Sequence, residues 1–457
     1  MFDPQVAEIR FGTGLSPTLP APQSAEAMLD GLVGADPMAR DFPIELFDGY
    51  RRRITSYQKA RRSERRADSD VAREEARQQR RQISRDARGV YADMIRDTLL
   101  RRIETRAGFR ERLSFFWADH FTARGKSNIV KFATSPYIEE AIRPNIAGRF
   151  EDLLIEAVTH PLMLHYLDQA QSVGPNSKLG KRRGRGLNEN LAREVLELHT
   201  LGVGGPYTQD DVRQLAELFA GLSLDREAGF VFKDAHVEPG PETVLGKTYG
   251  ASDGLEAIHD ALRDLARHPA TAKHIATKLA QHFTSDTPDP DLIEAMTKAY
   301  LQSNGGLLNT YVALLNHPAS WRRDYHNIKR PVDYVATALR ALDVGAQILK
   351  RSRSRELLDL IVTPMQVMGQ SWQAPNGPDG WPEENNFWIT PQFMAARLAW
   401  ALSAPQRFKR VLPDPEDFAI TALGQNAPPE VAFAASAAEN RWEGIALVLA
   451  SPAFQRF

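Results

Sequence analysis

Residues 188–202, NENLAREVLELHTLG, contain the sharpest group of side chains that could perform acid–base chemistry. Asn188 is a good N-cap residue and Gly202 a good stop, so the segment is predicted to form one helix. On a helical wheel its apolar side chains cover more than half of the circumference. A helix that is apolar over such a width is largely buried.

Two of its polar side chains fall on the buried side of this predicted helix. His199 lies in the middle of the apolar arc and Glu194 just inside its edge, whereas Arg193, Glu197 and Asn190 face the other way. A buried carboxyl group must be paired or protonated, and such groups are frequent at functional sites. The alternatives are a structural network around Glu194 and a satisfied core histidine at His199.

Two further clusters combine histidine with aspartate. Residues 115–121, FFWADHF, place Asp119 and His120 among four aromatic side chains on a predicted helix. Residues 160–168, HPLMLHYLD, place His160 before a helix that begins at a proline, with Asp168 one or two turns on. We interpret Glu194, Glu197, Asp119, His120 and His199 as the candidate catalytic residues.

No strong metal or nucleotide motif is present. The sequence lacks H-E-x-x-H, an EF-hand loop, a Walker A sequence and a G-x-S-x-G elbow. A metal site assembled across helices from His120, His160, Glu194 and His199 remains an alternative. The sequence therefore identifies no cofactor.

Three of the seven tryptophans, Trp372, Trp381 and Trp388, lie in one segment, residues 364–391, which is predicted to be a long loop. Flat aromatic rings beside amide and carboxylate groups suit sugar rings. The alternative is that these rings plug the loop onto the helical body. With the tryptophans, the candidate substrate-binding residues are Asn188, Arg193, His160 and Asp168.

The composition limits the class of protein. The chain has 457 residues, of which 42% are hydrophobic and 25% charged, with a formal net charge of −1. This is ordinary for a globular protein and argues against nucleic acid as the partner. Cysteine is absent, which excludes disulfides, thiol nucleophiles and Cys-ligated zinc.

Helical patterns dominate, and the only strand-like stretch is 229–232. We predict an all-α fold: one large multi-helix domain with long irregular loops and at most a minor β-hairpin. Its segments are an irregular N-terminal arm (1–42), a charged long-helix segment that packs on or projects from the body (43–105), and the main helical domain (106–457). Beyond 200, helices are predicted at 209–221, 253–267, 269–284, 289–303, 306–316 and 330–342.

Positive charge is concentrated in two segments. Residues 51–88 contain 14 basic and six acidic residues, a local net of +8, so the rest of the chain carries −9. Residues 172–186 are predicted to form a long basic loop without internal structure. Either segment could dock on an acidic surface, although interleaved acidic residues also suit a solvated helix.

The stretch NENLAREVLELHTLGVGGPYTQDDVRQLAELFAGLSLD resembles the signature of a bacterial family, domain of unknown function 1800. Further matching pieces stand in the family's order: RFGTGLSP, FWADHF, HPLMLHYLD, HPATAKHIATKLAQHF, GQSWQAPNGPDGW and LASPAFQRF. The resemblance extends from about residue 8 to 457. The chain departs from the family where Leu222, instead of the frequent tryptophan, follows Gly221.

The resemblance implies no settled activity. Family members often neighbour a second family, domain of unknown function 1501, which looks sulfatase- or phosphatase-like and is commonly exported by the twin-arginine route. Many members carry export signals, whereas the N-terminus here has no basic n-region and no apolar h-region. We expect a cytoplasmic protein with no transmembrane segment, or one that reaches the periplasm as a passenger of such a partner.

Three hypotheses about function follow. The first is an enzyme that acts on a polysaccharide or related glycan, with Glu194 as a protonated general acid and Asp119 or Glu197 as the ionised partner. His120 or His199 could instead act as a base. The second is a non-catalytic helical partner or chaperone-like protein for the sulfatase- or phosphatase-like protein. The third is a metal-dependent enzyme.

Overall fold

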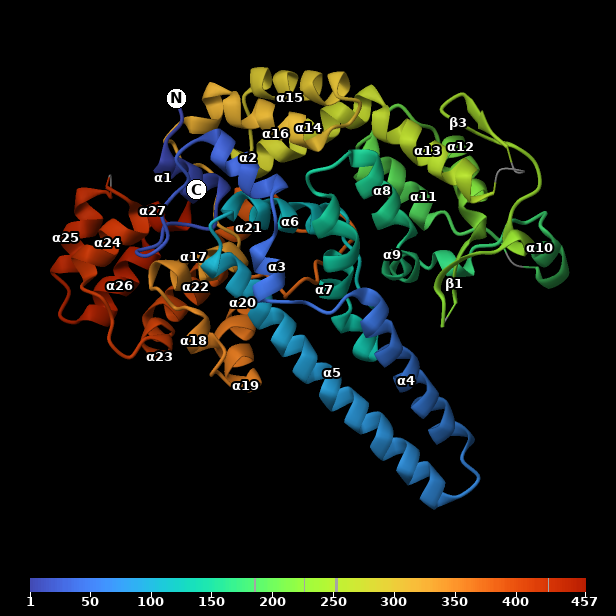
Figure 1. Cartoon of the computed structure of the whole chain (residues 1–457), viewed down its shortest axis with the longest axis horizontal. Helices are drawn as coiled ribbons and strands as arrows, with labels where there is room; N and C mark the ends of the chain where they lie inside the picture. The colour runs from blue at the N-terminus through green and yellow to red at the C-terminus, as the bar shows by residue number, and fades with distance from the viewer. Residues whose placement is uncertain (185, 226, 251–253, 426) are drawn as a thin grey trace.

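The computed structural model describes residues 1–184, 186–225, 227–250, 254–425 and 427–457. Helices dominate it, and its strands form two small antiparallel pairs (Figure 1). β1 (Leu222–Asp225) pairs with β2 (Gly229–Phe232), and β3 (Glu242–Val244) pairs with β4 (Lys247–Tyr249). The prediction of an all-α fold is confirmed, and the strand-like stretch at 229–232 is β2.

The N-terminal half contains most of the elements around the candidate site. Its helices are α1 (Pro4–Val6), η1 (Ala7–Phe11), α2 (Ala25–Val33), α3 (Pro37–Asp41), α4 (Phe47–Arg66), α5 (Asp70–Glu104), α6 (Gly108–His120), η2 (Asn128–Phe132), α7 (Thr134–Tyr137), η3 (Ile138–Ile142), η4 (Arg143–Asn145), α8 (Phe150–Thr159), α9 (Pro161–Tyr166), η5 (Gln169–Gln171), α10 (Lys178–Arg183), α11 (Asn190–Glu194), η6 (Val195–Thr200), α12 (Gln209–Leu218), η7 (Phe219–Gly221) and η8 (Asp234–His236).

The C-terminal half continues with further short helices. They are α13 (Leu255–Arg267), α14 (Pro269–Phe283), α15 (Pro290–Gln302), α16 (Leu307–Asn316), η10 (Pro318–Trp321), α17 (Pro331–Ala341), α18 (Ala346–Leu349), α19 (Ser354–Leu357), η11 (Leu358–Val362), α20 (Thr363–Val367), α21 (Asn385–Trp388), α22 (Pro391–Ser403), α23 (Pro405–Phe408), α24 (Pro415–Leu423), α25 (Pro429–Ser436), α26 (Arg441–Ala450) and α27 (Pro452–Gln455).

Local signals explain where these helices begin. Thr208 and Asp211 form a capping box at the start of α12, in which each side chain accepts from the other's main-chain N–H. Proline occupies the first position of α14, α15 and α17, where its missing N–H costs nothing. The boundaries predicted from the sequence for α12 to α17 agree with the structure to within three residues.

Two segments predicted to be loops contain helices. The basic segment 172–186 holds α10, whose N-terminus is capped by the Ser177 hydroxyl, which accepts from the Gly180 N–H at 3.0 Å. The prediction of no internal structure there was wrong because the serine cap was overlooked. The segment 364–391 includes part of α20 and all of α21, each too short to give a periodic apolar pattern.

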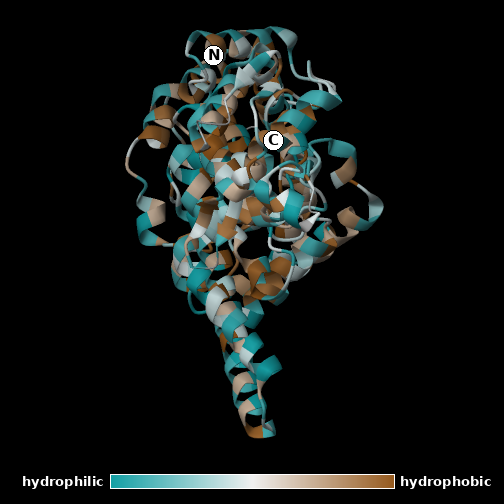
Figure 2. Cartoon of the chain, turned by 90° about the vertical axis from the view of Figure 1, so that its right-hand side faces the viewer, coloured by the Kyte–Doolittle hydropathy of each residue, from teal (hydrophilic) through white to brown (hydrophobic). Residues whose placement is uncertain are grey.

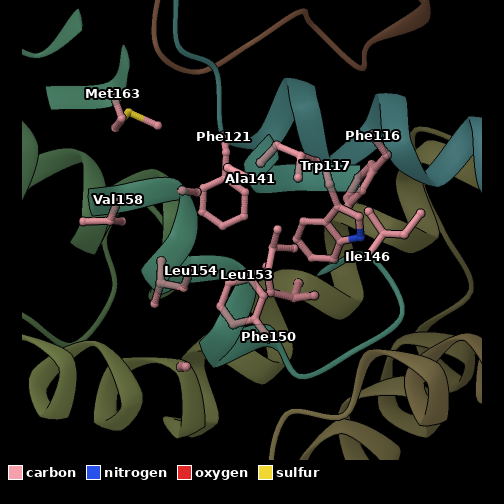
Figure 3. Close-up of a cluster of buried hydrophobic side chains, with 14 of the residues drawn as sticks. Phe116, Trp117, Phe121, Ala141, Ile146, Phe150, Leu153, Leu154, Val158 and Met163 are labelled. Atoms are coloured by element: carbon pink, nitrogen blue, oxygen red, sulfur yellow. The ribbon is translucent and has the colours of Figure 1, made fainter. Parts of the chain in front are cut away.

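The body is organised around two apolar clusters. The larger one joins α6, α8, α9 and α11–α16, and the smaller one joins α5, α17, α22 and α24–α27. In the larger cluster the rings of Trp117 and Phe121 lie against Phe150, with centroids 5.6 and 6.1 Å apart (Figure 3). This packing fixes the C-terminal end of α6, where Asp119 and His120 are found.

α4 and the N-terminal part of α5 form a two-helix arm that projects from the body (Figures 1 and 2). Tyr57 and Ala60 of α4 and Ala76 and Ala87 of α5 are buried. Most other side chains along the arm are exposed and polar, as the hydrophilic colouring in Figure 2 shows. The arm therefore exposes most of its charge to solvent.

Candidate functional site

The helix predicted at 188–201 is present, but its second half has π-helical geometry. α11 ends at Glu194 and η6 continues to Thr200, whose hydroxyl donates to the carbonyl of Val195 at 2.6 Å. Single π-turns inside helices are frequent at functional sites. As the wheel predicted, His199 is buried, with 1% of its surface exposed, and Glu194 is half-buried.

Glu194 is a carboxyl group without a partner. Burial, together with the negative charges of Glu197 and Asp379, raises the pKa of Glu194 to about 7, and Arg193 opposes this only in part. Within the described ranges its carboxyl group makes no hydrogen bond or ion pair. The group is therefore partly protonated at neutral pH and free to exchange its proton.

Asp379 and Tyr166 interact electrostatically with Glu194, and Arg124 interacts with Tyr166. Burial raises the pKa of the Tyr166 phenol, which the Arg124 guanidinium opposes and the charges of Glu194 and Asp379 reinforce. Arg124 also donates to the carbonyl of Asn376 at 3.2 Å and forms no ion pair within the described part of the chain. Asp379 is exposed, so this group opens to solvent on its side.

Lys278 of α14 lies at the inner side of the same group. Burial lowers the pKa of its amino group, while three carboxylates act in the opposite direction. The amino group makes no hydrogen bond or ion pair with any residue that the structure describes. The titratable groups with which it interacts electrostatically are Glu383, Asp119, Asp379, Arg330, His120, His199 and His274.

Three neutral histidines lie behind Lys278. The Nε2 atom of His120 is 3.2 Å from the carbonyl oxygen of His199, and Nε2 of His274 is 3.1 Å from that of Leu198. Burial and the charge of Lys278 lower the pKa of His199 to about 3. Both ring nitrogens of His199 are buried without a hydrogen-bond partner in the described structure. It therefore differs from the satisfied core histidine that was the alternative.

Asp119 belongs to a buried chain of charges. Its carboxylate accepts from Arg330 at 2.7 Å and from the main-chain N–H of Trp381 at 2.9 Å. Arg330 also pairs with Glu383 at 2.8 Å, and Glu383 lies 3.2 Å from Nδ1 of His282. Although burial acts to raise it, Arg330 and His282 hold the pKa of Glu383 well below its usual range.

The chain of charges extends toward the base of the arm. The other ring nitrogen of His282 lies 3.3 Å from Arg112, and Arg112 is 3.9 Å from Asp333. Asp333 also pairs with Arg102 of α5. This network fixes the loop that carries Asp379, because Trp381 and Glu383 are both bound to it.

Gly380 allows the loop that carries Asp379 to approach Asp119. Its φ is +82°, and a Cβ atom there would lie 2.8 Å from both the carbonyl oxygen and Oδ1 of Asp119. We expect Gly380→Ala to lower the free energy of unfolding by about 1–3 kcal/mol, measured by urea denaturation. Gly246→Ala is the control, because Gly246 has a φ of +77° but open space around it. Equal losses in both variants would contradict a tight contact with Asp119.

Other predicted site residues serve local contacts. Arg193 pairs with Glu197 at 3.4 Å and with Glu189 at 3.1 Å. Asn188 donates to the carbonyl of Leu167 at 3.0 Å and accepts from the Asn190 N–H. These bonds orient the start of α11, close to Glu194.

His160 and Asp168 make their contacts away from Glu194. Nδ1 of His160 accepts from the Leu162 N–H at 3.1 Å and caps α9, while its Nε2 lies 3.7 Å from Glu140. Asp168, in the left-handed region, accepts from Lys126 at 2.6 Å. The structure thus brings Glu194, Glu197, Asp119, His120 and His199 into one region, but not His160.

The three tryptophans of the 364–391 segment are buried. Trp372, Trp381 and Trp388 are 6, 8 and 1% exposed. Trp381 and Trp388 pack on each other with centroids 5.9 Å apart, and Trp372 joins the smaller apolar cluster. Their rings therefore present almost no surface on which a sugar could stack, and they anchor the segment to the body.

A small cavity adjoins the site. Between Asp119, Trp381 and Gln373 it measures about 20 Å³, which is room for one water molecule. Within the described residues no three His, Asp or Glu side chains are arranged to hold a metal ion.

Sequence reasoning missed Lys278, Asp379, Tyr166, Arg124 and Arg330. Three of them lie in segments that carry the family resemblance: Tyr166 in HPLMLHYLD, Lys278 in HPATAKHIATKLAQHF and Asp379 in GQSWQAPNGPDGW. The contacts of Arg124 and Arg330 become visible only when distant segments fold together. Arg330, for example, is 211 residues from Asp119.

Together these features define an all-α protein in which the unpartnered groups Glu194 of α11 and Lys278 of α14 both interact electrostatically with Asp379 of the loop before α21. The chain belongs to the family described as Protein of unknown function (DUF1800), whose model matches residues 9–456. No curated protein and no solved structure matches it. No helix in the described ranges is long and apolar enough to cross a membrane.

Proposed function

We propose that the protein is a glycan hydrolase in which Glu194 is the general acid. The observation that carries this proposal is the half-buried carboxyl group of Glu194, which has a pKa of about 7 and no partner among the described residues. An acid of this kind suits protonation of a leaving group near neutral pH, as in enzymes that cleave glycosidic bonds.

Asp379 is the best candidate for the ionised partner. Of the carboxylates considered from the sequence, Asp119 is bound to Arg330 and Trp381, and Glu197 is paired with Arg193. Asp379 is exposed, and its negative charge acts directly on Glu194. A pair of carboxyl groups, one protonated and one ionised, is the arrangement that glycoside hydrolysis requires.

The reaction would then proceed as follows. Glu194 donates its proton to the glycosidic oxygen while the bond from this oxygen to the anomeric carbon breaks. A water molecule bonds to that carbon and gives its proton to Asp379. Lys278 and Arg124 bind the acidic or hydroxyl groups of the sugar, and the neutral histidines exclude water from the inner side of the site.

The first experiment is a screen of purified protein against defined neutral and acidic polysaccharides, with new reducing ends as the readout. We expect release of reducing ends from at least one of them. If the wild-type protein releases none across the panel while it remains folded, the proposal fails.

The pH dependence of the reaction follows from the pKa of Glu194. We expect kcat/KM to fall by about tenfold per pH unit above pH 7, as the general acid loses its proton. Glu197→Gln removes a charge that raises the pKa of Glu194, so the alkaline limb of the plot of kcat/KM against pH should shift to lower pH. Glu294→Gln, on the exposed side of α15, is the control and should leave the limb unchanged. A limb that neither variant moves would argue against Glu194 as the acid.

A second candidate function is a non-catalytic partner of a sulfatase- or phosphatase-like protein, with which the chain could also reach the periplasm. The observation that favours it is a groove of about 250 Å³ at the base of α4, lined by Phe47, Ile54, Leu162 and Leu224. The test is co-purification with such a protein after co-expression. Leu224→Asp should abolish co-purification, and a failure of the wild-type chain to co-purify would reject this role.

A further inference from the structure

The two-helix arm carries a dense set of cations without ion-pair partners. At 1.5 Å per residue, α4 is about 30 Å long and α5 about 50 Å. Eight exposed cations of the arm have no carboxylate within ion-pair distance among the described residues. They are Lys59, Arg61, Arg62, Arg65, Arg66, Arg81, Arg85 and Arg88.

The spacing of these residues arranges them in rows. Arg81, Arg85 and Arg88 follow each other at i, i+4 and i+7, so they share one face of α5. Arg61 and Arg65 do the same on α4. Arginine is well suited to bind carboxylates through paired N–H groups. The arm therefore presents a surface that fits an acidic protein face.

The C-terminal helices α24, α25 and α26 provide a surface of the opposite charge. Residues 414–443 contain six acidic residues and one arginine. Of the carboxylates in this range, none forms an ion pair with a residue that the structure describes. They are Asp414, Glu416, Asp417, Glu430, Glu439 and Glu443.

Exposed apolar side chains accompany these carboxylates. Ile420 is 51% and Phe433 73% exposed, and Leu447 of α26 is also exposed. Asp417 precedes Ile420 by three residues and Glu430 precedes Phe433 by three, so each pair shares a helix face. Exposed apolar groups gathered on packed helices are typical of a protein–protein interface.

These two surfaces cannot meet within one molecule. The arm extends beyond the body in both views (Figures 1 and 2), and in Figure 1 its tip points away from α24–α26. Yet they are opposite in charge, because residues 51–88 carry a net +8 and residues 414–443, with six acidic residues and one arginine, a net −5. We propose that the arm docks on the α24–α26 face of a second copy of this chain.

Reciprocal docking closes the assembly as a two-fold dimer, because each copy offers one arm and one face. Charge pairs at such a surface are screened over about 8 Å at physiological ionic strength and over about 3 Å at 1 M salt. Association should therefore weaken as salt is added. The exposed apolar side chains of the face add a contribution that salt does not screen.

The test is the mass of the full chain in solution, measured by sedimentation at low and high salt. We expect a species of twice 51.1 kDa at low salt that dissociates toward 51.1 kDa as salt rises. An arm variant with Arg81→Glu, Arg85→Glu and Arg88→Glu should be a monomer at low salt. A face variant with Glu416→Lys, Asp417→Lys and Glu430→Lys should be a monomer as well.

Mixing the two variants gives the decisive result. The acidic arm of the arm variant is opposite in charge to the basic face of the face variant. The unchanged basic arm of the face variant is opposite in charge to the unchanged acidic face of the arm variant. The mixture should therefore form dimers, although neither variant does so alone. Lys178→Glu, Lys181→Glu and Arg182→Glu on α10 change the net charge equally and should leave the dimer intact. A wild-type chain of 51.1 kDa at low salt, or arm variants that dimerise alone, would overturn the proposal.

Discussion

Replacing Glu194 by glutamine should lower kcat by about 100- to 10,000-fold on any glycan that the wild-type protein cleaves, because a general acid contributes about that much. Glutamine has the shape of the protonated carboxyl group but cannot give up a proton to the glycosidic oxygen. KM should change little, since binding of the sugar relies on other groups. The measurement is steady-state kinetics near pH 7.

The same substitution should leave the fold intact. Glu194 makes no hydrogen bond or ion pair with described residues, so glutamine removes no stabilising contact. Glu189→Gln is the matched control, because Glu189 adjoins the same helix but pairs with Arg193. It should keep a rate close to that of the wild type. A Glu194→Gln variant with an unchanged kcat would remove Glu194 from the mechanism.

Arg330→Met should lower the free energy of unfolding by about 3–5 kcal/mol, the usual cost of leaving buried charges without a partner. Arg330 is 3% exposed and is the cation shared by Asp119 and Glu383. Without it two carboxylates repel each other in the interior. The measurement is urea denaturation followed by circular dichroism.

Arg322→Met is the control, because it removes an arginine from an exposed ion pair instead of a buried one. Arg322 also pairs with an aspartate, Asp289 at 3.0 Å, but its side chain is 61% exposed. Exposed ion pairs of this kind contribute about 0–1 kcal/mol.

Arg330→Met combined with Asp119→Asn and Glu383→Gln should recover part of the loss, because the uncompensated charges disappear. A loss below 1 kcal/mol in Arg330→Met alone would show that the buried network does not hold the loop.

Local patterns predicted much of the fold, since proline at the first helical position, N-caps and apolar periodicity gave the boundaries of α12 to α17 to within three residues. The buried position of His199 and the edge position of Glu194 also followed from periodicity alone. α10 was missed because one serine cap, not an apolar pattern, specifies it. Short helices stabilised mainly by their surroundings leave little signal in the sequence.

The candidate site was predicted in part. The sequence pointed to Glu194 but not to the groups around it, because the charge of Asp379 acts on Glu194 from a distant loop, and Lys278 and Arg124 come from two other segments. The tryptophans of residues 364–391 were interpreted as sugar-binding rings, with anchoring of the loop to the body as the alternative, and burial in the body gives large aromatics a strong stabilising effect. Composition alone does not tell an anchoring ring from a binding one.

The most direct test of the proposed function is to incubate the protein with the polysaccharide panel in water labelled with ¹⁸O and to analyse the products by mass spectrometry. Hydrolysis assisted by Glu194 and Asp379 should place one labelled oxygen on each new reducing end, and Glu194→Gln should suppress these products. Products without the label, or labelled products formed equally well by Glu194→Gln, would contradict the account.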